Sequence, residues 1–140
     1  MTNDSIFFHS ECEFELENIQ ERGGWIESTI ARENKETGAL NYIFCSDEYL
    51  LEKNREFLNH DTYTDIITFD YCVGDIVNGD IFISVDRVKE NSDTFNVGFN
   101  DELDRVLIHG ALHLIGYQDK TEEEQKQMRS KEDFYLSLRP

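Results

Sequence analysis

Two histidines four positions apart in an apolar run place the strongest constraint on this chain. His109 and His113 lie in the segment 107–119, and in a helix such side chains project from the same face, one turn above the other. Gly116 stands where this helix would end, because glycine adopts the left-handed conformation that reverses the chain. The reversal brings Asp119 toward the imidazoles. The pattern predicts two nitrogens and one oxygen around a cation such as zinc, with a fourth position open to water, as in catalytic zinc sites.

Histidines at this spacing also occur in helix cores, where each ring hydrogen-bonds a backbone carbonyl. The chain has only 4 histidines, and two of them share a helical face with a glycine turn and a carboxylate, which favours the metal. The pair differs from the metalloprotease motif, since Gly110 stands where His-Glu-x-x-His supplies its general base. The base must come from another segment, or the water activated by the ion must suffice.

The run His109-Gly-Ala-Leu-His113-Leu-Ile-Gly-Tyr-Gln-Asp119 resembles the His-Gly-x-Leu-His-Leu-x-Gly-Tyr-Asp-His signature of the YbeY family. Two further segments are similar to that family in the same order. Residues 54–69 correspond to its Leu-Asn-x-x-Tyr-Arg-x-x-x-x-Pro-Thr-Asp-Val-Leu-Ser-Phe segment, and residues 79–84 to its Gly-Asp-Ile-x-Ile-Ser strand. The resemblance covers the chain from about Leu40 to its end.

This resemblance implies a single-strand-specific, metal-dependent endoribonuclease that acts in ribosomal RNA maturation and ribosome quality control. His109, His113 and Asp119 would then hold one divalent ion, zinc or another transition metal, and would act through the water that this ion activates. Ribosomal RNA is the expected partner, together with ribosome-associated proteins, and no DNA substrate is expected.

The chain departs from the family pattern at two positions. Asp119 stands where the family usually has a third histidine, and its harder oxygen ligand makes the site more tolerant of manganese, iron or nickel. Leu58 aligns with a family arginine that is thought to help hold the substrate phosphate. Arg55 and His60 are the candidate substitutes for binding substrate, although Arg55 also fits a solvated helix residue.

Two other functions share the same metal. The ion could polarise an amide in a small hydrolase of peptide-like substrates, but the missing glutamate base counts against that function. Alternatively, the ion is structural and the protein is a non-enzymatic ribosome-assembly partner.

At 140 residues, we expect residues 1–140 to form a single metal-dependent hydrolase domain. No apolar run approaches the length of a membrane span and no basic-then-apolar leader is present, so a cytoplasmic protein without membrane contact is expected. The three cysteines have no Cys-x-x-Cys pair, so a disulfide framework or a thiolate zinc site is not expected.

The charge of the chain opposes an RNA substrate. Thirty acidic residues against 13 basic residues give a formal net charge of −17, which predicts repulsion from a polyphosphate. A ribonuclease is compatible with this charge only if basic residues and the metal gather in one cleft. Otherwise the acidity is a solubility feature.

The hydrophobic pattern alternates helices with about four short strands. Strands are predicted at 6–9, 40–45, 66–71 and 80–84, with a turn at 37–38 and a hairpin turn at 75–78. Helices are predicted from Asn18 to Glu33, weakened at Gly23-Gly24, from 46 or 47 to 58, and over 85–95. The metal helix would be capped by Asn100 or Asp101, and a final helix would begin with a capping box at 121–124. The fold class is therefore α/β or α+β, and the family implies a mixed four-stranded sheet with helices packed around a central metal-bearing helix.

Overall fold

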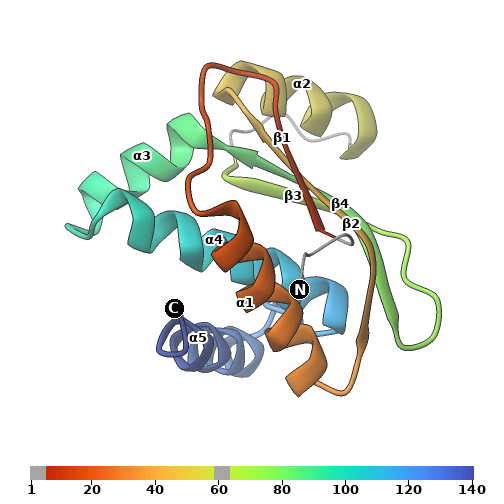
Figure 1. Cartoon of the computed structure of the whole chain (residues 1–140). Helices are drawn as coiled ribbons and strands as arrows, with labels where there is room; N and C mark the ends of the chain where they lie inside the picture. The colour runs from red at the N-terminus through yellow and green to blue at the C-terminus, as the bar shows by residue number, and fades with distance from the viewer. Residues whose placement is uncertain (1–5, 59–63) are drawn as a thin grey trace.

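The computed structural model describes residues 6–58 and 64–140, in which helices and strands alternate (Figure 1). In chain order the elements are β1 (Ile6–Ser10), α1 (Ile19–Arg32), β2 (Glu36–Cys45), α2 (Asp47–Leu58), β3 (Ile66–Asp70), β4 (Ile76–Ser84), α3 (Val85–Thr94), α4 (Phe99–Ile115) and α5 (Glu122–Leu136). The predicted mixture of helices and strands is confirmed.

Four of the described segments form one mixed sheet in the order β1-β2-β4-β3. β1 and β4 both run parallel to β2, whereas β3 runs antiparallel to β4. The antiparallel pair is the predicted hairpin. Its turn lies earlier than the predicted 75–78, because Val73 and Ile76 exchange backbone hydrogen bonds across Gly74, whose φ is 58°.

Alternation of side chains along the strands gives the sheet an apolar surface on each face. In β2, Leu40, Tyr42 and Phe44 belong to the larger core, whereas Cys45 packs with Leu50 of α2 in a smaller cluster. Figure 1 shows the corresponding layers, with α2 on one side of the sheet and α1 and α4 on the other. α4 therefore packs on the sheet beside α1, and α5 packs against α4.

α4 is the central helix of this arrangement. It contacts α1, α3, α5, β3 and β4. Ten of its residues are buried, and they occupy several sides of the helix: Glu102, Leu103, Asp104, Val106, Leu107, Ile108, Gly110, Ala111, Leu112 and Leu114. A helix that is apolar on most sides has to be enclosed by other elements, as the sequence predicted.

Gly110 lets α4 approach the sheet closely. A Cβ atom at this position would lie 3.0 Å from side-chain atoms of both Ile66 and Ile81, a separation too short for relaxed carbon contacts. The glycine between the two histidines therefore has a packing role, and it also fixes the distance between the helix and the sheet.

Two local predictions are wrong. Neither Asn100 nor Asp101 caps α4, because the helix begins earlier, with Gly98 as N-cap and no side-chain cap, and Phe99 packs edge-on against Phe14. The predicted turn at 37–38 lies inside β2, where pairing with β4 continues through a register shift between Thr37 and Leu40.

The remaining element predictions are close to the structure. α1 continues through Gly23-Gly24 without a break, because Trp25 and Ile26 are buried in the core on the same helix. The capping box of α5 is present, with Thr121 and Glu124 each bonded to the other's backbone N–H. Within the described ranges, no helix is sufficiently long and apolar to cross a membrane.

We predict that Gly110→Ala lowers the free energy of unfolding by about 1–3 kcal/mol, because the added methyl group has to displace Ile66 and Ile81 in a packed core. Chemical denaturation followed by circular dichroism measures this change. Gly24→Ala is the matched control, since nothing lies within 4 Å of the added atom. That control should raise the free energy of unfolding by about 0.5–1 kcal/mol, and equal effects of the two variants would contradict the packing role of Gly110.

Candidate metal centre

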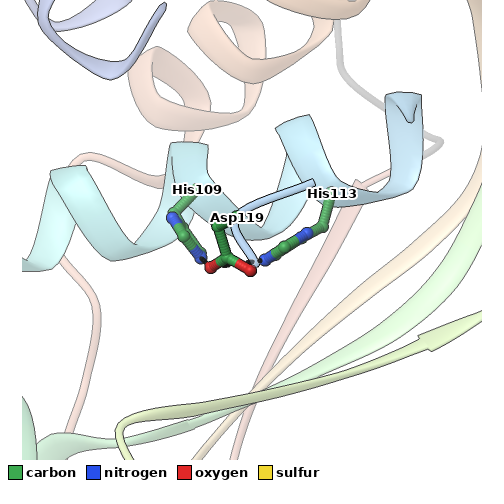
Figure 2. A group of neighbouring side chains, drawn as sticks. All are labelled: His109, His113 and Asp119. Carbon is green, nitrogen blue, oxygen red and sulfur yellow. Dashed lines mark ion pairs between the residues drawn. The ribbon is translucent and has the colours of Figure 1, made fainter. Parts of the chain in front are cut away.

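The side chains of His109, His113 and Asp119 converge on one point at the end of α4 (Figure 2). The Nε2 atoms of His109 and His113 lie 3.4 Å and 3.3 Å from Oδ2 of Asp119. The centroids of the two imidazole rings are 4.5 Å apart, and the planes of the rings are nearly perpendicular. Three potential ligand atoms therefore face a common volume.

These separations fit a tetrahedral metal. Bond lengths of about 2.0–2.1 Å and tetrahedral angles place neighbouring ligand atoms of zinc roughly 3.3–3.4 Å apart, and both nitrogen-to-oxygen distances have these values. Ordinary hydrogen bonds between imidazole and carboxylate would be shorter. Two imidazole nitrogens and a carboxylate oxygen are also ligands that zinc accepts, so the residues present fit one divalent ion.

The loop after α4 places Asp119 and also orients His113. Gly116 has a φ of 130°, which a residue with a Cβ rarely adopts, and the N–H groups of Gly116 and Tyr117 both bond the Leu112 carbonyl. Nδ1 of His113 lies 3.0 Å from the Tyr117 carbonyl oxygen. A carbonyl only accepts, so Nδ1 carries the proton and Nε2 is left unprotonated toward the metal position.

His109 is oriented by Glu132 of α5. Nδ1 of His109 donates to Oε2 of Glu132 over 2.6 Å, while Arg105 donates to Oε1 over 2.8 Å. Burial by itself raises the pKa of Glu132, but the bonds from His109 and Arg105 outweigh it, and the pKa lies below its ordinary value. Glu132 is therefore a buried carboxylate that fixes the ring of His109 with Nε2 toward the metal position.

A second carboxylate anchors the loop from the other side. Glu33, which follows α1, accepts hydrogen bonds from the hydroxyl groups of Tyr117 and Tyr135 and from the ammonium group of Lys131. Burial by itself raises the pKa of Glu33, but these hydrogen bonds outweigh it and lower the pKa below its ordinary value. Since the Tyr117 carbonyl orients His113, Glu33 supports a metal ligand that it does not touch.

A cavity of about 480 Å³ opens beside the three ligands. Its walls come from the start of β3 and from α3, α4 and α5, and they include Asp65, Phe95, Arg105 and Arg129. Burial raises the pKa of Asp65, although the charge of His109 acts in the opposite direction. Glu102 also lines this cavity, and burial raises its pKa too, so a substrate reaching the ligands would meet two arginines, one aromatic ring and two carboxyl groups of raised pKa.

Only some of the site residues proposed from the sequence come together in the structure. His109, His113 and Asp119 come together, whereas Arg55 lies on α2, which packs on the opposite face of the sheet from α4. His60 lies outside the described residues. Asp80, in the matched segment 79–84, accepts a hydrogen bond from Asn41 on the neighbouring strand.

The sequence interpretation assigned no role at the metal centre to Glu33 or Glu132. Glu33 and Glu132 lie on segments far from the histidines in the chain, and their spacing carries no periodic signal. Within α5 itself, Glu132 had one detectable signal, because it lies at helical spacing between Met128 and Tyr135, the apolar side of an otherwise charged segment.

The similarity to known proteins extends over almost the entire chain. A family model described as Endoribonuclease YbeY matches residues 8–138. The curated Endoribonuclease YbeY of Flavobacterium psychrophilum is 53% identical over 133 residues, which cover 95% of each chain. That of Christiangramia forsetii is 51% identical over 138 residues, which cover 99% of this chain and 96% of the relative.

One solved structure has the same fold. The solution structure of TM1509 from Thermotoga maritima superimposes with a TM-score of 0.71 at 30% sequence identity. The superposition covers 94% of this chain and 87% of that chain.

We predict that Glu132→Gln weakens zinc binding by about 10–100-fold, because the amide no longer stabilises the proton on Nδ1 of His109 as a carboxylate does. Competition titration against a chromophoric chelator measures the affinity. The control is Asp133→Asn, which removes the exposed second partner of Arg105 at 2.7 Å and should change the affinity less than about threefold. Equal losses in both variants would mean that the Arg105 pairing, and not the orientation of His109, is responsible.

We predict that Glu33→Gln lowers the free energy of unfolding at pH 7 by about 1–2 kcal/mol, through loss of charge-assisted hydrogen bonds. Because the pKa of Glu33 is lower in the folded than in the unfolded chain, its ionisation stabilises the fold above about pH 4.5 and this contribution disappears as the pH falls through the folded-state value. Urea titrations between pH 7 and pH 3.5 should show the difference shrinking. Glu56→Gln, at an exposed position of α2, should have little effect throughout.

Proposed function

The chain belongs to the YbeY endoribonuclease family, and from that membership we propose that it cuts single-stranded ribosomal RNA by metal-assisted hydrolysis of a phosphodiester. The proposed role is in ribosomal RNA maturation and ribosome quality control. A ribosomal substrate would place the protein in the cytoplasm and in contact with ribosome-associated proteins.

The observation that carries this proposal is the convergence of three ligand atoms at tetrahedral spacing beside an open cavity. His109, His113 and Asp119 supply the ligand atoms. The Nε2 atom of each histidine lies 3.3–3.4 Å from Oδ2 of Asp119. Three protein ligands leave one position for water or substrate, which is the arrangement of catalytic zinc sites. A purely structural zinc site has four protein ligands.

We propose zinc as the ion, held by His109, His113 and Asp119. A divalent ion at this position lowers the pKa of water toward about 7 and stabilises negative charge on a phosphoryl oxygen. The protein holds the imidazoles in the tautomer that presents Nε2, through Glu132 and the Tyr117 carbonyl. Asp65, on the cavity wall, is a candidate to exchange a proton with a group at the metal position, because burial raises its pKa above the ordinary value.

The cavity also holds the carboxyl groups of Asp65, Glu102, Asp119 and Glu132, so a polyphosphate strand requires cations there to offset them. Arg105 and Arg129 both line the cavity beside the ligands, and a divalent ion would add further positive charge there. Association with RNA depends on the field at the cleft more than on the net charge of the chain. Arg55 and His60 remain proposed contacts of the RNA strand.

The proposal predicts that purified protein contains about one equivalent of a divalent metal and cleaves unstructured RNA faster than duplex RNA. His113→Ala and Asp119→Ala should each lower the metal content and reduce cleavage by more than about hundredfold, with the circular dichroism spectrum retained. Elemental analysis and a gel assay with labelled RNA measure both quantities. His9→Ala, a histidine bonded to Asn41 on the sheet, is the matched control and should leave both unchanged.

Three outcomes would contradict parts of this proposal. Unchanged metal content in Asp119→Ala would remove Asp119 from the ligand set. Unfolding of His113→Ala on loss of the ion would favour a structural metal and a non-enzymatic role. Metal-loaded wild-type protein that leaves unstructured RNA intact would overturn the endoribonuclease assignment.

A further inference from the structure

A second cavity adjoins the cavity at the metal ligands. It has a volume of about 610 Å³ and is bounded by the C-terminal end of α3, the N-terminal half of α4 and the C-terminal half of α5. Phe95, Glu102, Arg105 and Arg129 line both cavities. The two cavities therefore adjoin at these four side chains, and a chain molecule that leaves the ligands in this direction passes the side chains to reach the second cavity.

Phe95 presents an aromatic ring on the shared wall. Phe95 is 61% exposed, and Val97, which lines the second cavity, is 45% exposed. The backbone of Phe95 is fixed as the C-cap of α3, with its N–H bonded to the Asn91 carbonyl at 2.9 Å. Asn96 then turns the chain away with a φ of 56°. The ring is therefore held on a rigid helix end while leaving much of its surface for another group.

Arg129 is the loosely held cation of this wall. Arg105 donates to Glu132 and Asp133 at 2.8 Å and 2.7 Å, whereas Arg129 lies 3.7 Å from Glu132 and its side chain is 62% exposed. Arg129 also lines a third hollow, which runs along α5 and includes His109 and Asp119. A guanidinium group at the junction of three hollows is well placed to contact a phosphate on a strand passing the metal position.

The acidic groups of the same wall are largely compensated. Asp101 is bonded to Arg139 at 3.0 Å and Asp133 to Arg105 at 2.7 Å. Burial raises the pKa of Glu102, which favours its neutral form. The charge presented to a ligand beside Arg129 is therefore less negative than the composition of the wall indicates.

We propose that Phe95 and Arg129 form a subsite for one unpaired nucleotide of an RNA strand, adjacent to the phosphate at the metal ligands. The base stacks on the ring of Phe95, and its phosphate pairs with the guanidinium group of Arg129. This inference rests on the proposed function, since it takes its ligand from the strand that the metal centre would cut.

This subsite selects unpaired nucleotides. A base within a duplex has both faces covered by its neighbours, whereas a base in a single strand can leave the stack and lie on an aromatic ring. Stacking of this kind tolerates any base, because every base has a π-face. The subsite therefore gives a physical origin for single-strand preference without sequence preference.

The first test measures binding of a fluorescein-labelled single-stranded oligoribonucleotide to metal-free protein by anisotropy. Phe95→Leu, which keeps apolar volume but removes the π-face, should weaken binding about tenfold, while Phe95→Trp should retain it. Phe134→Leu is the matched control, because Phe134 is 49% exposed and lines neither cavity. Equal affinities of Phe95→Leu and wild type would overturn the subsite.

The second test uses the salt dependence of the same binding. Arg129→Gln should reduce the slope of log affinity against log salt concentration by about 0.7, the value for one contact to a single-strand phosphate, and Arg129→Lys should keep the slope. Lys89→Gln is the control, because Lys89 has a similar exposure of 65% and lines neither cavity. A slope that Arg129→Gln leaves unchanged would remove Arg129 from the subsite.

The third test deletes single bases from the oligoribonucleotide. One abasic position should weaken binding to the wild type about tenfold and have no effect on Phe95→Leu, since the partner of the base is then already absent. If the abasic position weakened the binding of Phe95→Leu as much as that of the wild type, the stacking contact would be overturned. These tests use metal-free protein, so they separate the subsite from the proposed function. If binding depends on Phe95 but metal-loaded protein cuts no RNA, the subsite stands and the endoribonuclease assignment fails. If metal-loaded protein cuts RNA but binding does not depend on Phe95, the endoribonuclease assignment stands and the subsite fails.

Discussion

Burial of α4 on most of its sides, with two imidazoles left facing an open cavity, is the constraint on which the rest of the structure depends. Apolar residues of this helix pack against β3, β4, α1, α3 and α5, which places it in the middle of the fold. Gly110 sets how closely it meets the sheet, and its two histidines lie half-buried on the side of the helix that lines the cavity. The position of the metal centre therefore follows from the packing of the core.

The histidines could be predicted from the sequence because their geometry is local. A spacing of four residues on a helix, followed by a glycine that turns the chain, fixes the relative positions of three side chains within eleven residues of sequence, from His109 to Asp119. The capping box at Thr121 was equally local and was confirmed. The cap of α4 was predicted wrongly, because packing of Phe99 on Phe14 outweighs the capping preference of Asn100 and Asp101.

The groups that orient the ligands could not be predicted in the same way. Glu33 comes from the segment after α1 and Glu132 from α5, and only tertiary packing brings them to the loop and to His109, respectively. In the sequence each is one of thirty acidic residues. The subsite at Phe95 and Arg129 has the same origin, because it joins the end of α3 to the middle of α5. Sequence reasoning thus located the candidate ligands but missed the parts of the site that depend on distant contacts.

The placement of Glu132 on α5 has a consequence for biosynthesis. Translation proceeds from the N-terminus, so the histidines are made before the carboxylate that holds the ring of His109 in place. A nascent chain that has completed α4 but not α5 carries all three metal-binding side chains without this restraint. Competence for catalysis would then arise only when the C-terminal helix docks, which delays nuclease activity until synthesis of this region is finished.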